Sequence, residues 1–304
     1  MIFISVIIPV YNKDQYIIET VQSVLEQSYR NFELVIIDDG STDRTHELIN
    51  SISDFRIKYH HQKNQGVSAA RNKGISLAIG QLLALLDGDD LWEPDYLERI
   101  VELTNTFPNE SVFSTAYSFK EESKAIVKAK YSIKKTQNWS GIIDDYFKSS
   151  LRDPLLTSSS IVLRHQVFDV VGGFPEGYNL GEDLDMWCRI ALNYNVVFSM
   201  NPRVIYRRDI ANNVRKTVEI DRDFPVISTL EESERVYIDR SMTKYLSLYC
   251  MKCAVRYSFV FNKEKFDELI YKAIKYSLSS RFFICFLKAT YHFLRFNFVC
   301  LIRK

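Results

Sequence analysis

Three carboxylates crowd into four positions directly after an apolar run. Leu82–Leu86 carries only apolar side chains, and Asp87, Gly88, Asp89 and Asp90 follow it. Like charges this close together raise one another's pKa unless a cation lies among them. Mg²⁺ is usually held by one or two carboxylates together with substrate phosphate oxygens, and Mn²⁺ accepts the same ligands. The stretch therefore predicts a divalent cation, Mg²⁺ or Mn²⁺, that holds a diphosphate.

Strands that alternate with helices are expected to position these carboxylates. Predicted strands lie at 2–10, within 32–43, at 56–61 and at 81–86; predicted helices lie within 13–28, at 45–52 and within 66–80, the last stopped by a glycine. This alternation predicts an α/β fold with a mostly parallel sheet, in which ligands bind beyond the carboxyl ends of the strands. Tyr11–Asn12, Asp38–Asp39 and Asp87–Asp90 follow three of these strands. We therefore expect them to converge on one active site.

The composition narrows the classes of function. The chain has 304 residues, 46% of them hydrophobic, and a net charge of +1, which predicts one large α/β domain with an appendage and no whole-surface binding of nucleic acid. No G-x-G-x-x-G follows the first strand and no G-x-x-x-x-G-K-[ST] occurs, so a dinucleotide-binding dehydrogenase and a P-loop nucleotidase are not expected. Cys250 and Cys253 lack a second ligand pair, so we expect reduced cysteines packed among helices.

Five motifs resemble those of the family 2 glycosyltransferases in order and spacing. They are VIIPVYN, LVIIDDGSTD, NQGVSAARNKGI, LLDGDD and GEDLDMWCRI, and the resemblance covers about residues 3–210. It implies an inverting enzyme of the GT-A type, with a Rossmann-like, mostly parallel sheet flanked by helices. Such an enzyme would transfer a hexosyl or N-acetylhexosaminyl group from a nucleotide-sugar donor, most often UDP-linked.

The resemblance also implies roles on the donor side of the site. Asp39 would accept a hydrogen bond from the nucleotide base, although an Asx turn is an ordinary alternative for such an aspartate. Arg71 would help to neutralise the diphosphate or orient an aspartate. Asp89 would ligate Mn²⁺ or Mg²⁺. Asp87 would be a second residue of the metal site, as a ligand or behind the ligands, or would contact the ribose. Asp90 would cap the following segment. The other residues implied to bind the nucleotide sugar are Pro9, Tyr11 and Gly88.

On the acceptor side, the resemblance implies that Asp183 of the Glu-Asp pair is the general base. Inverting transfer is a single displacement, in which a carboxylate removes the acceptor proton as its oxygen attacks the anomeric carbon. The alternative is an acidic pair favoured by the dipole of a helix whose inward side carries Trp187 and Ile190. Residues expected to shape the acceptor pocket or to support the site are Glu182, Gly173, Phe174, Arg207 and Arg208. The stretch 118–139 is expected to form a mobile flap or hairpin.

Two features differ from relatives. Processive relatives carry a Q-x-x-R-W signature and several long membrane spans, and neither is found, so transfer of one sugar or a few is expected. Many relatives carry a histidine near 204–213, where this chain has Asp209. A histidine role is therefore not carried over, while Arg207 or Arg208 remains a candidate for contact with the diphosphate.

The chain is expected to divide into a glycosyltransferase domain at 1–215 and a helical region at 216–304. The first would comprise a nucleotide-binding part at about 1–110 and an acceptor part at about 111–215; amphipathic helices are expected beyond about 225. The tail, about 281–304, would place basic residues on one helical stripe beside a wide aromatic face. The stripe consists of Arg281, Lys288, His292, Arg295 and Arg303.

This tail suits an interfacial helix on anionic lipid, the alternatives being a helix packed on the enzyme itself or on a dimer partner. No secretory signal is visible at the N-terminus. We therefore expect a cytoplasmic enzyme, peripheral on the inner face of the plasma membrane. The resemblance to family 2 glycosyltransferases further implies that its acceptor is a glycan or a lipid-linked glycan in the assembly of bacterial surface polysaccharide.

Two other functions compete with this one. A nucleotidyltransferase also uses metal-bound aspartates on a related sheet, but the basic glycine-rich loop is missing and the Glu-Asp pair would have no role. A catalytically silent, sugar-nucleotide-binding scaffold at the membrane is the alternative from another class. The presence of both Asp89 and Asp183 favours an enzyme.

Overall fold

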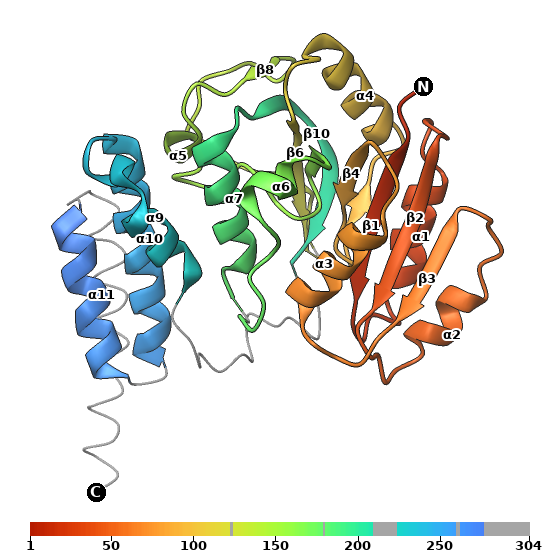
Figure 1. Cartoon of the computed structure of the whole chain (residues 1–304), viewed down its shortest axis with the longest axis horizontal. Coiled ribbons are helices and arrows are strands. Elements are labelled where there is room, and N and C mark those ends of the chain that lie inside the picture. Colours follow the sequence, from red (N-terminus) through yellow and green to blue (C-terminus); the bar gives the residue numbers. More distant parts are fainter. Residues whose placement is uncertain (122–123, 179, 209–223, 260–261, 277–304) are drawn as a thin grey trace, which may run out of the picture.

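A ten-stranded sheet in the order β3-β2-β1-β4-β9-β6-β10-β5 forms the centre of the protein (Figure 1), with β7 and β8 paired to β6 and β10. The computed structural model describes residues 1–121, 124–178, 180–208, 224–259 and 262–276. The strands are β1 (Ile4–Val10), β2 (Phe32–Asp38), β3 (Ile57–His61), β4 (Leu82–Leu85), β5 (Leu91–Trp92), β6 (Val112–Lys120), β7 (Val127–Lys128), β8 (Ser140–Ile142), β9 (Ile161–Arg164) and β10 (Val197–Arg207). The helices are α1 (Ile17–Leu25), α2 (Thr45–Asn50), α3 (Val67–Leu77), α4 (Tyr96–Thr106), α5 (Tyr146–Ser149), α6 (Val167–Val171), α7 (Glu182–Asn193), α9 (Pro225–Glu232), the 3₁₀ helix η1 (Glu234–Tyr237), α10 (Arg240–Phe259) and α11 (Lys263–Tyr276).

The first four strands form the parallel unit that the sequence predicts. β1 pairs in parallel with β2 on one side and with β4 on the other, and β3 extends the sheet beyond β2. β1, β2 and β4 are buried along their whole length, as parallel strands covered on both faces are. Right-handed crossovers place α1 and α2 on one face and α3 on the other, and Figure 1 shows α3 in front of the sheet. The carboxyl ends of these strands therefore meet at one edge.

Helix α3 packs closely on β1. A Cβ at Gly74 would overlap Cγ2 of Ile7, so the helix can approach the strand only because this residue has no side chain. Arg71 lies one turn earlier on the same helix and is buried. The expected stop at Gly80 is wrong by about a turn, because Ala78 already adopts an extended backbone that ends the helix.

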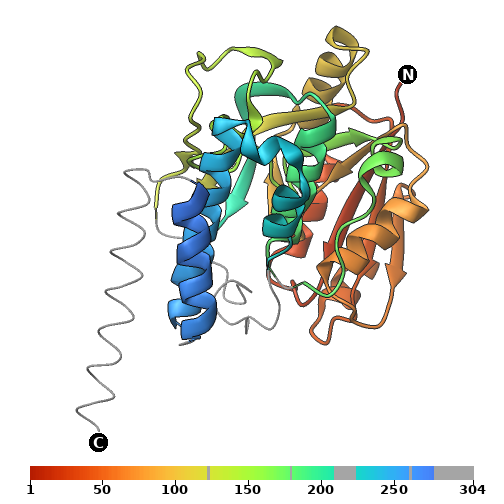
Figure 2. The ribbon, with the colours of Figure 1, turned by 60° about the vertical axis from the view of Figure 1, so that its left-hand side comes forward.

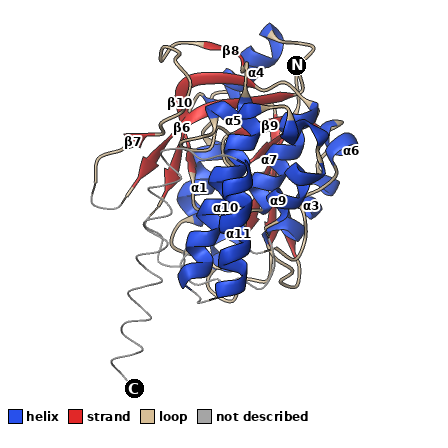
Figure 3. Ribbon diagram, turned by 90° about the vertical axis from the view of Figure 1, so that its left-hand side faces the viewer, coloured by secondary structure: helices blue, strands red, loops and turns tan. Residues whose placement is uncertain are grey.

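Beyond β4 the sheet becomes mixed. β9 runs antiparallel between β4 and β6, whereas β10 is parallel to β6. β10 consequently ends on the same edge as β4, with Arg207 as its last residue. β6 and β7 form an antiparallel hairpin within the stretch 118–139, seen beside β10 in Figure 3.

The helical region expected beyond residue 225 is confirmed in the described residues. Helices α9 and α10 pack against α7 and α5, with α11 outside α10 (Figures 1 and 2). Helix α10 is not the amphipathic helix that was expected, because every residue from Tyr245 to Met251 is buried. It contacts α11 on one side and α5, α9 and η1 on others.

The cysteines of helices α7 and α10 are thiols, as expected. Cys188, Cys250 and Cys253 are free and buried.

The expected domain boundary at 215 and the tail at 281–304 lie outside the described residues. Within the described ranges, no helix combines the length and apolar character that crossing a membrane requires.

Candidate active site

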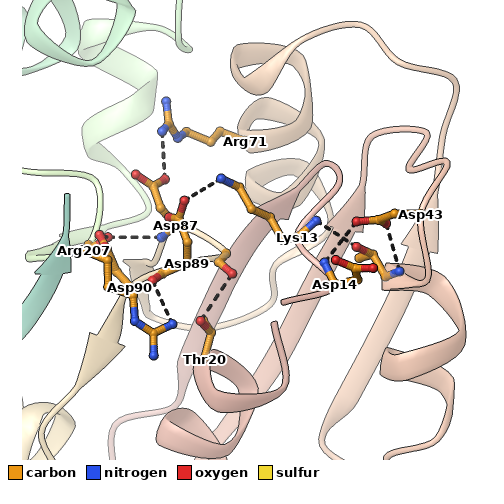
Figure 4. A network of polar contacts seen from close by, with 12 residues as sticks. Lys13, Asp14, Thr20, Asp43, Arg71, Asp87, Asp89, Asp90 and Arg207 are labelled. Atoms are coloured by element: carbon orange, nitrogen blue, oxygen red, sulfur yellow. Dashed lines mark hydrogen bonds and ion pairs between the residues drawn. The ribbon is translucent and has the colours of Figure 1, made fainter. Parts of the chain in front are cut away.

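The turn after β1 joins the ends of two strands. Asn12 adopts the left-handed conformation (φ 50°), which asparagine tolerates better than most residues. Its Oδ1 accepts from the N–H of Thr42 over 2.8 Å, and its own N–H donates to Oγ of Ser41 over 3.0 Å. The N–H of Lys13 then donates to Oγ1 of Thr45 over 2.9 Å. These hydrogen bonds hold the backbone of the turn, and the Lys13 side chain points toward the end of β4 (Figure 4).

The two aspartates at the end of β2 have different partners. Asp38 closes the turn after β2, since its Oδ1 accepts from the N–H of Ser41, three residues on, over 2.8 Å. Asp39 is only 3% exposed. Its Oδ1 accepts from Nε2 of Gln62 and the N–H of Gln65 over 2.8 and 2.9 Å, and its Oδ2 accepts from the N–H of Gly66 over 2.8 Å. Asp39 therefore holds the loop that leads into α3. Its own N–H donates to the carbonyl of Val10 over 2.8 Å, and Tyr11, the residue after Val10, is 46% exposed.

Each aspartate after β4 also has its own partner (Figure 4). Oδ1 of Asp87 accepts from Arg71 over 2.9 Å, and Oδ2 of Asp89 lies 2.5 Å from Nζ of Lys13. Asp90 accepts from Oγ of Ser159 over 2.5 Å and from the N–H of Arg207 over 2.9 Å. Each of the three carboxylates is thus held by a different set of hydrogen-bond donors.

Asp90 does not cap the following segment, so that expectation is wrong. It is 1% exposed and joins β4 to β10, while Asp95 is the residue that precedes helix α4. Burial raises the pKa of Asp90 well above its ordinary range, and the charges of Asp89 and Asp87 raise it further. Burial also raises the pKa of Asp89, against the lowering effect of the Lys13 ammonium.

Gly88 and Pro9 lie against one another where β1 and β4 end. A Cβ on Gly88 would come within 3.3 Å of the carbonyl oxygen of Pro9 and of Cγ2 of Val10. The Gly88 carbonyl accepts from Oγ1 of Thr20 over 3.3 Å. The glycine between the two aspartates therefore lets the loop close onto β1.

The start of α7 brings the Glu-Asp pair to the same site. Oε1 of Glu182 accepts from NH1 of Arg71 over 3.1 Å, and Oδ1 of Asp183 accepts from the N–H of Leu184 over 2.7 Å. Burial raises the pKa of Glu182 to about 7, and the neighbouring Asp183 adds to this. Although burial opposes it, Asp87 and Glu182 raise the pKa of Arg71, which keeps its positive charge. Trp187 and Ile190 face inward and are buried, as predicted.

The glycine loop before α7 is tied to α3 by Asn72. The N–H of Phe174 donates to Oδ1 of Asn72 over 2.8 Å, and Nδ2 of Asn72 donates to the Phe174 carbonyl over 2.9 Å. A Cβ on Gly173 would lie 2.8 Å from the same Oδ1. The buried ring of Phe174 lies 5.1 Å from the Arg71 guanidinium. Phe174 thus supports Arg71.

The two arginines at the end of β10 point to different places. Arg207 donates from NH1 to the Asp89 carbonyl over 3.3 Å and pairs with Glu19. Arg208 lies over the Phe119 ring, 3.2 Å from its centroid, and 3.9 Å from Asp153. Arg207 is therefore part of the carboxylate cluster, whereas these Arg208 contacts lie on β6 and the segment before β9.

Comparison with known proteins decides the family. The model of glycosyl transferase family 2 matches residues 5–172, more than half of the chain. The chain belongs to this family. The match ends before α7, so the Glu-Asp pair lies outside it.

Proteins with similar sequences are named as glycosyltransferases. One from Rickettsia conorii is 39% identical over 191 residues, which is 62% of this chain and 30% of that protein. GlyG of Streptococcus pneumoniae is 35% identical over 121 residues, 39% of this chain and 40% of GlyG. The chain therefore spans less than half the length of these two relatives.

The fold is that of solved GT-A glycosyltransferases. Residues 1–349 of TarS from S. aureus, in a complex with UDP-GlcNAc, superpose with a TM-score of 0.74 at 18% identity. The alignment covers 96% of this chain and 89% of the TarS chain. The expected family 2 resemblance and GT-A type fold are both confirmed.

The carboxylates after β4 are of the kind that bind a divalent cation, but by themselves they do not form a complete metal site. Asp87 and Asp89 supply the hard oxygen ligands that Mg²⁺ and Mn²⁺ accept. No group of three or more His, Cys, Asp or Glu side chains in the described part of the chain is placed to hold a metal ion. A cation here would therefore take its other ligands from phosphate and water.

Three contributors to the site were not predicted. Lys13 directly follows the VIIPVYN motif, and Asn72 lies within NQGVSAARNKGI. Their positions next to or within these motifs could have identified them as candidate site residues. Tyr249 of α10 lies against the start of α7, because a Cβ on Gly181 would come within 2.5 Å of its hydroxyl oxygen. Its position in the sequence carries no motif that could have marked it.

Proposed function

We propose that the chain transfers a sugar, with inversion, from a UDP-sugar to a hydroxyl of a glycan or lipid-linked glycan acceptor. The observation that carries this proposal is the position of Arg71, which donates to Asp87 at the end of β4 and to Glu182 at the start of α7. One guanidinium thus joins Asp87, an expected donor-binding aspartate, to the helix of the expected base. The complex of TarS with UDP-GlcNAc supports the choice of a UDP-linked donor.

Asp183 is proposed as the general base. Glu182 is buried against Arg71, whereas Asp183 is partly exposed at the first turn of α7 and can reach a bound acceptor. In the reaction the acceptor oxygen bonds to the anomeric carbon while the bond from that carbon to the diphosphate oxygen breaks. Asp183 takes the acceptor proton, and the electron pair of the broken bond leaves with the diphosphate.

The donor is proposed to lie along the strand ends. Asp39 would receive the nucleotide base, and Asp89 with Asp87 would hold Mn²⁺ or Mg²⁺. When bound, such a cation stabilises the negative charge that develops on the leaving diphosphate. Arg71 keeps Asp87 and the start of α7 in a fixed relation, which orients both halves of the site. A peripheral position on the inner membrane face, through 281–304, stays a prediction.

Thermal unfolding with nucleoside diphosphates tests the donor site. We expect UDP to raise the melting temperature in Mn²⁺ and not in chelator, because a ligand that binds only the folded state stabilises it. Asp89→Asn should abolish the rise, and Asp144→Asn, whose side chain is 86% exposed, should keep it. No rise with any nucleotide would contradict the proposal.

Release of UDP from matching UDP-sugars then tests for catalysis. We expect release that depends on the divalent cation, and a product whose anomeric configuration, read by NMR, is opposite to that of the donor. Stabilisation by UDP without release from any donor would instead favour the silent binding protein.

A further inference from the structure

Lys13 differs from the other groups that hold the aspartates after β4. Asp87 is held by the buried, two-pronged guanidinium of Arg71, and Asp90 by a hydroxyl and a backbone N–H. Asp89 instead meets the ammonium of Lys13, a point charge on a flexible four-carbon stem, over 2.5 Å (Figure 4). An ammonium of this kind can leave one partner for another without disturbing the backbone.

The backbone of Lys13 is fixed while its side chain is at the edge of the site. Its N–H is held by Thr45, and the preceding Asn12 is held by Ser41 and Thr42. The Lys13 and Asp89 side chains keep 18% and 16% of their surface exposed. A ligand arriving at the strand ends could therefore reach this ion pair.

We propose that Lys13 is a positioning residue that occupies Asp89 until a nucleoside diphosphate arrives with its divalent cation. The inference rests on the proposed function. Lys13 and a divalent cation compete for the same carboxylate, so the cation alone binds weakly. A diphosphate offers phosphate oxygens both to the cation and to the ammonium displaced from Asp89. Lys13 therefore makes binding of the cation depend on binding of the diphosphate.

The ligand set of the protein agrees with this dependence. The described residues offer no group of three or more metal-ligating side chains, so a cation cannot be held here by the protein alone in a complete shell. In the free protein both expected ligands are engaged, Asp87 by the guanidinium of Arg71 and Asp89 by the ammonium of Lys13, and this lowers the affinity for the cation further. Phosphate oxygens, together with water, then complete the coordination shell of the cation.

The test is the affinity of the full chain for Mn²⁺, measured from the electron paramagnetic resonance of free Mn²⁺ with and without UDP. We expect Lys13→Met, and the second neutral variant Lys13→Gln, to bind Mn²⁺ about tenfold more tightly than wild type without UDP. The extra affinity that UDP confers on Mn²⁺ should shrink by at least the same factor. Lys13→Arg, which keeps the charge, should resemble wild type more closely, and Lys58→Met, at an exposed site on β3, should match wild type.

The result that overturns the inference is Mn²⁺ affinity without UDP that is the same in wild type and both neutral variants. This outcome is distinct from failure of the proposed function. If wild type binds Mn²⁺ and UDP together while the neutral variants change nothing, only the role of Lys13 is wrong. If wild type binds neither Mn²⁺ nor UDP in each other's presence, the proposed donor site is wrong as well.

Discussion

Asp87 at the end of β4 and Glu182 at the start of α7 are joined by one buried guanidinium. Arg71 donates from NH2 to Asp87 over 2.9 Å and from NH1 to Glu182 over 3.1 Å. Its side chain is 5% exposed and that of Glu182 is 10% exposed, so this ion pair is largely shielded from water, whereas Asp87 keeps 28% of its side-chain surface exposed. Movement of either element would leave a charge unpaired in the interior, which makes the relation between the two halves of the site stiff.

Replacement of Arg71 should cost both stability and activity. Arg71→Met leaves two carboxylates without their cation, and breaking a buried ion pair in this way costs about 3–5 kcal/mol. We expect that loss in the free energy of unfolding in urea, with release of UDP from the donor lowered at least about 100-fold. Arg71→Lys should lie between wild type and Arg71→Met, because a lysine cannot span both carboxylates in the planar geometry of a guanidinium. Wild-type stability in Arg71→Met would contradict the bridge.

Gly181 is expected to tolerate no side chain. Its φ is +83°, and a Cβ would lie 2.5 Å from the hydroxyl oxygen of Tyr249. Gly181→Ala should therefore lower the free energy of unfolding by about 2–4 kcal/mol, from backbone strain and overpacking together.

A double variant separates the two causes. Tyr249→Phe removes the hydroxyl, so Gly181→Ala combined with Tyr249→Phe should recover the packing part of the loss and keep the backbone part. If the losses of unfolding free energy in the two single variants, measured in urea, add up strictly in the double variant, the Tyr249 hydroxyl of α10 does not contact a side chain at position 181.

The sequence predicted the frame of the site because its signals are local. Apolar runs and helical spacing located β1 to β4 and the helices between them, and the strand ends at Asp39 and Asp87 converge as parallel topology requires. The inward side of α7 followed from periodicity alone, and Trp187 is buried.

The partners of these residues could not be predicted, since they depend on contacts between distant segments. Lys13 reaches Asp89 from a turn in which Asn12 adopts the left-handed conformation and bonds to Ser41 and Thr42. Asp90 sits where it could cap a helix, yet it bonds to Arg207 on β10, which no local pattern reveals. Helix α10 lost its expected amphipathic character because other helices cover it on more than one side.

The protonation of Glu182 should make stability depend on pH. Its pKa in the folded protein is about 7, above the ordinary value of 4.5, so the folded state holds this proton more tightly than the unfolded chain. The resulting contribution to stability is fully present below about pH 4.5 and is lost as pH rises through 7. At about 1.4 kcal/mol per pKa unit it amounts to roughly 3 kcal/mol.

Glu182→Gln isolates this contribution. The amide oxygen can still accept from Arg71, but the group no longer titrates. We expect the loss of unfolding free energy between pH 5 and pH 8 to be smaller in the variant than in wild type, because only the Glu182 carboxyl differs between the two proteins. Equal losses in the two proteins would show that Glu182 is not the group responsible.

The most direct test of the account is turnover of Asp183→Asn beside its affinity for UDP in Mn²⁺. We expect transfer to fall by about 10²–10⁴-fold, the usual contribution of a general base, with UDP affinity within about twofold of wild type. Asp169→Asn, at an exposed position on α6, should keep both. Transfer by Asp183→Asn at the wild-type rate would contradict the assignment of Asp183 as the base, and with it the proposed mechanism.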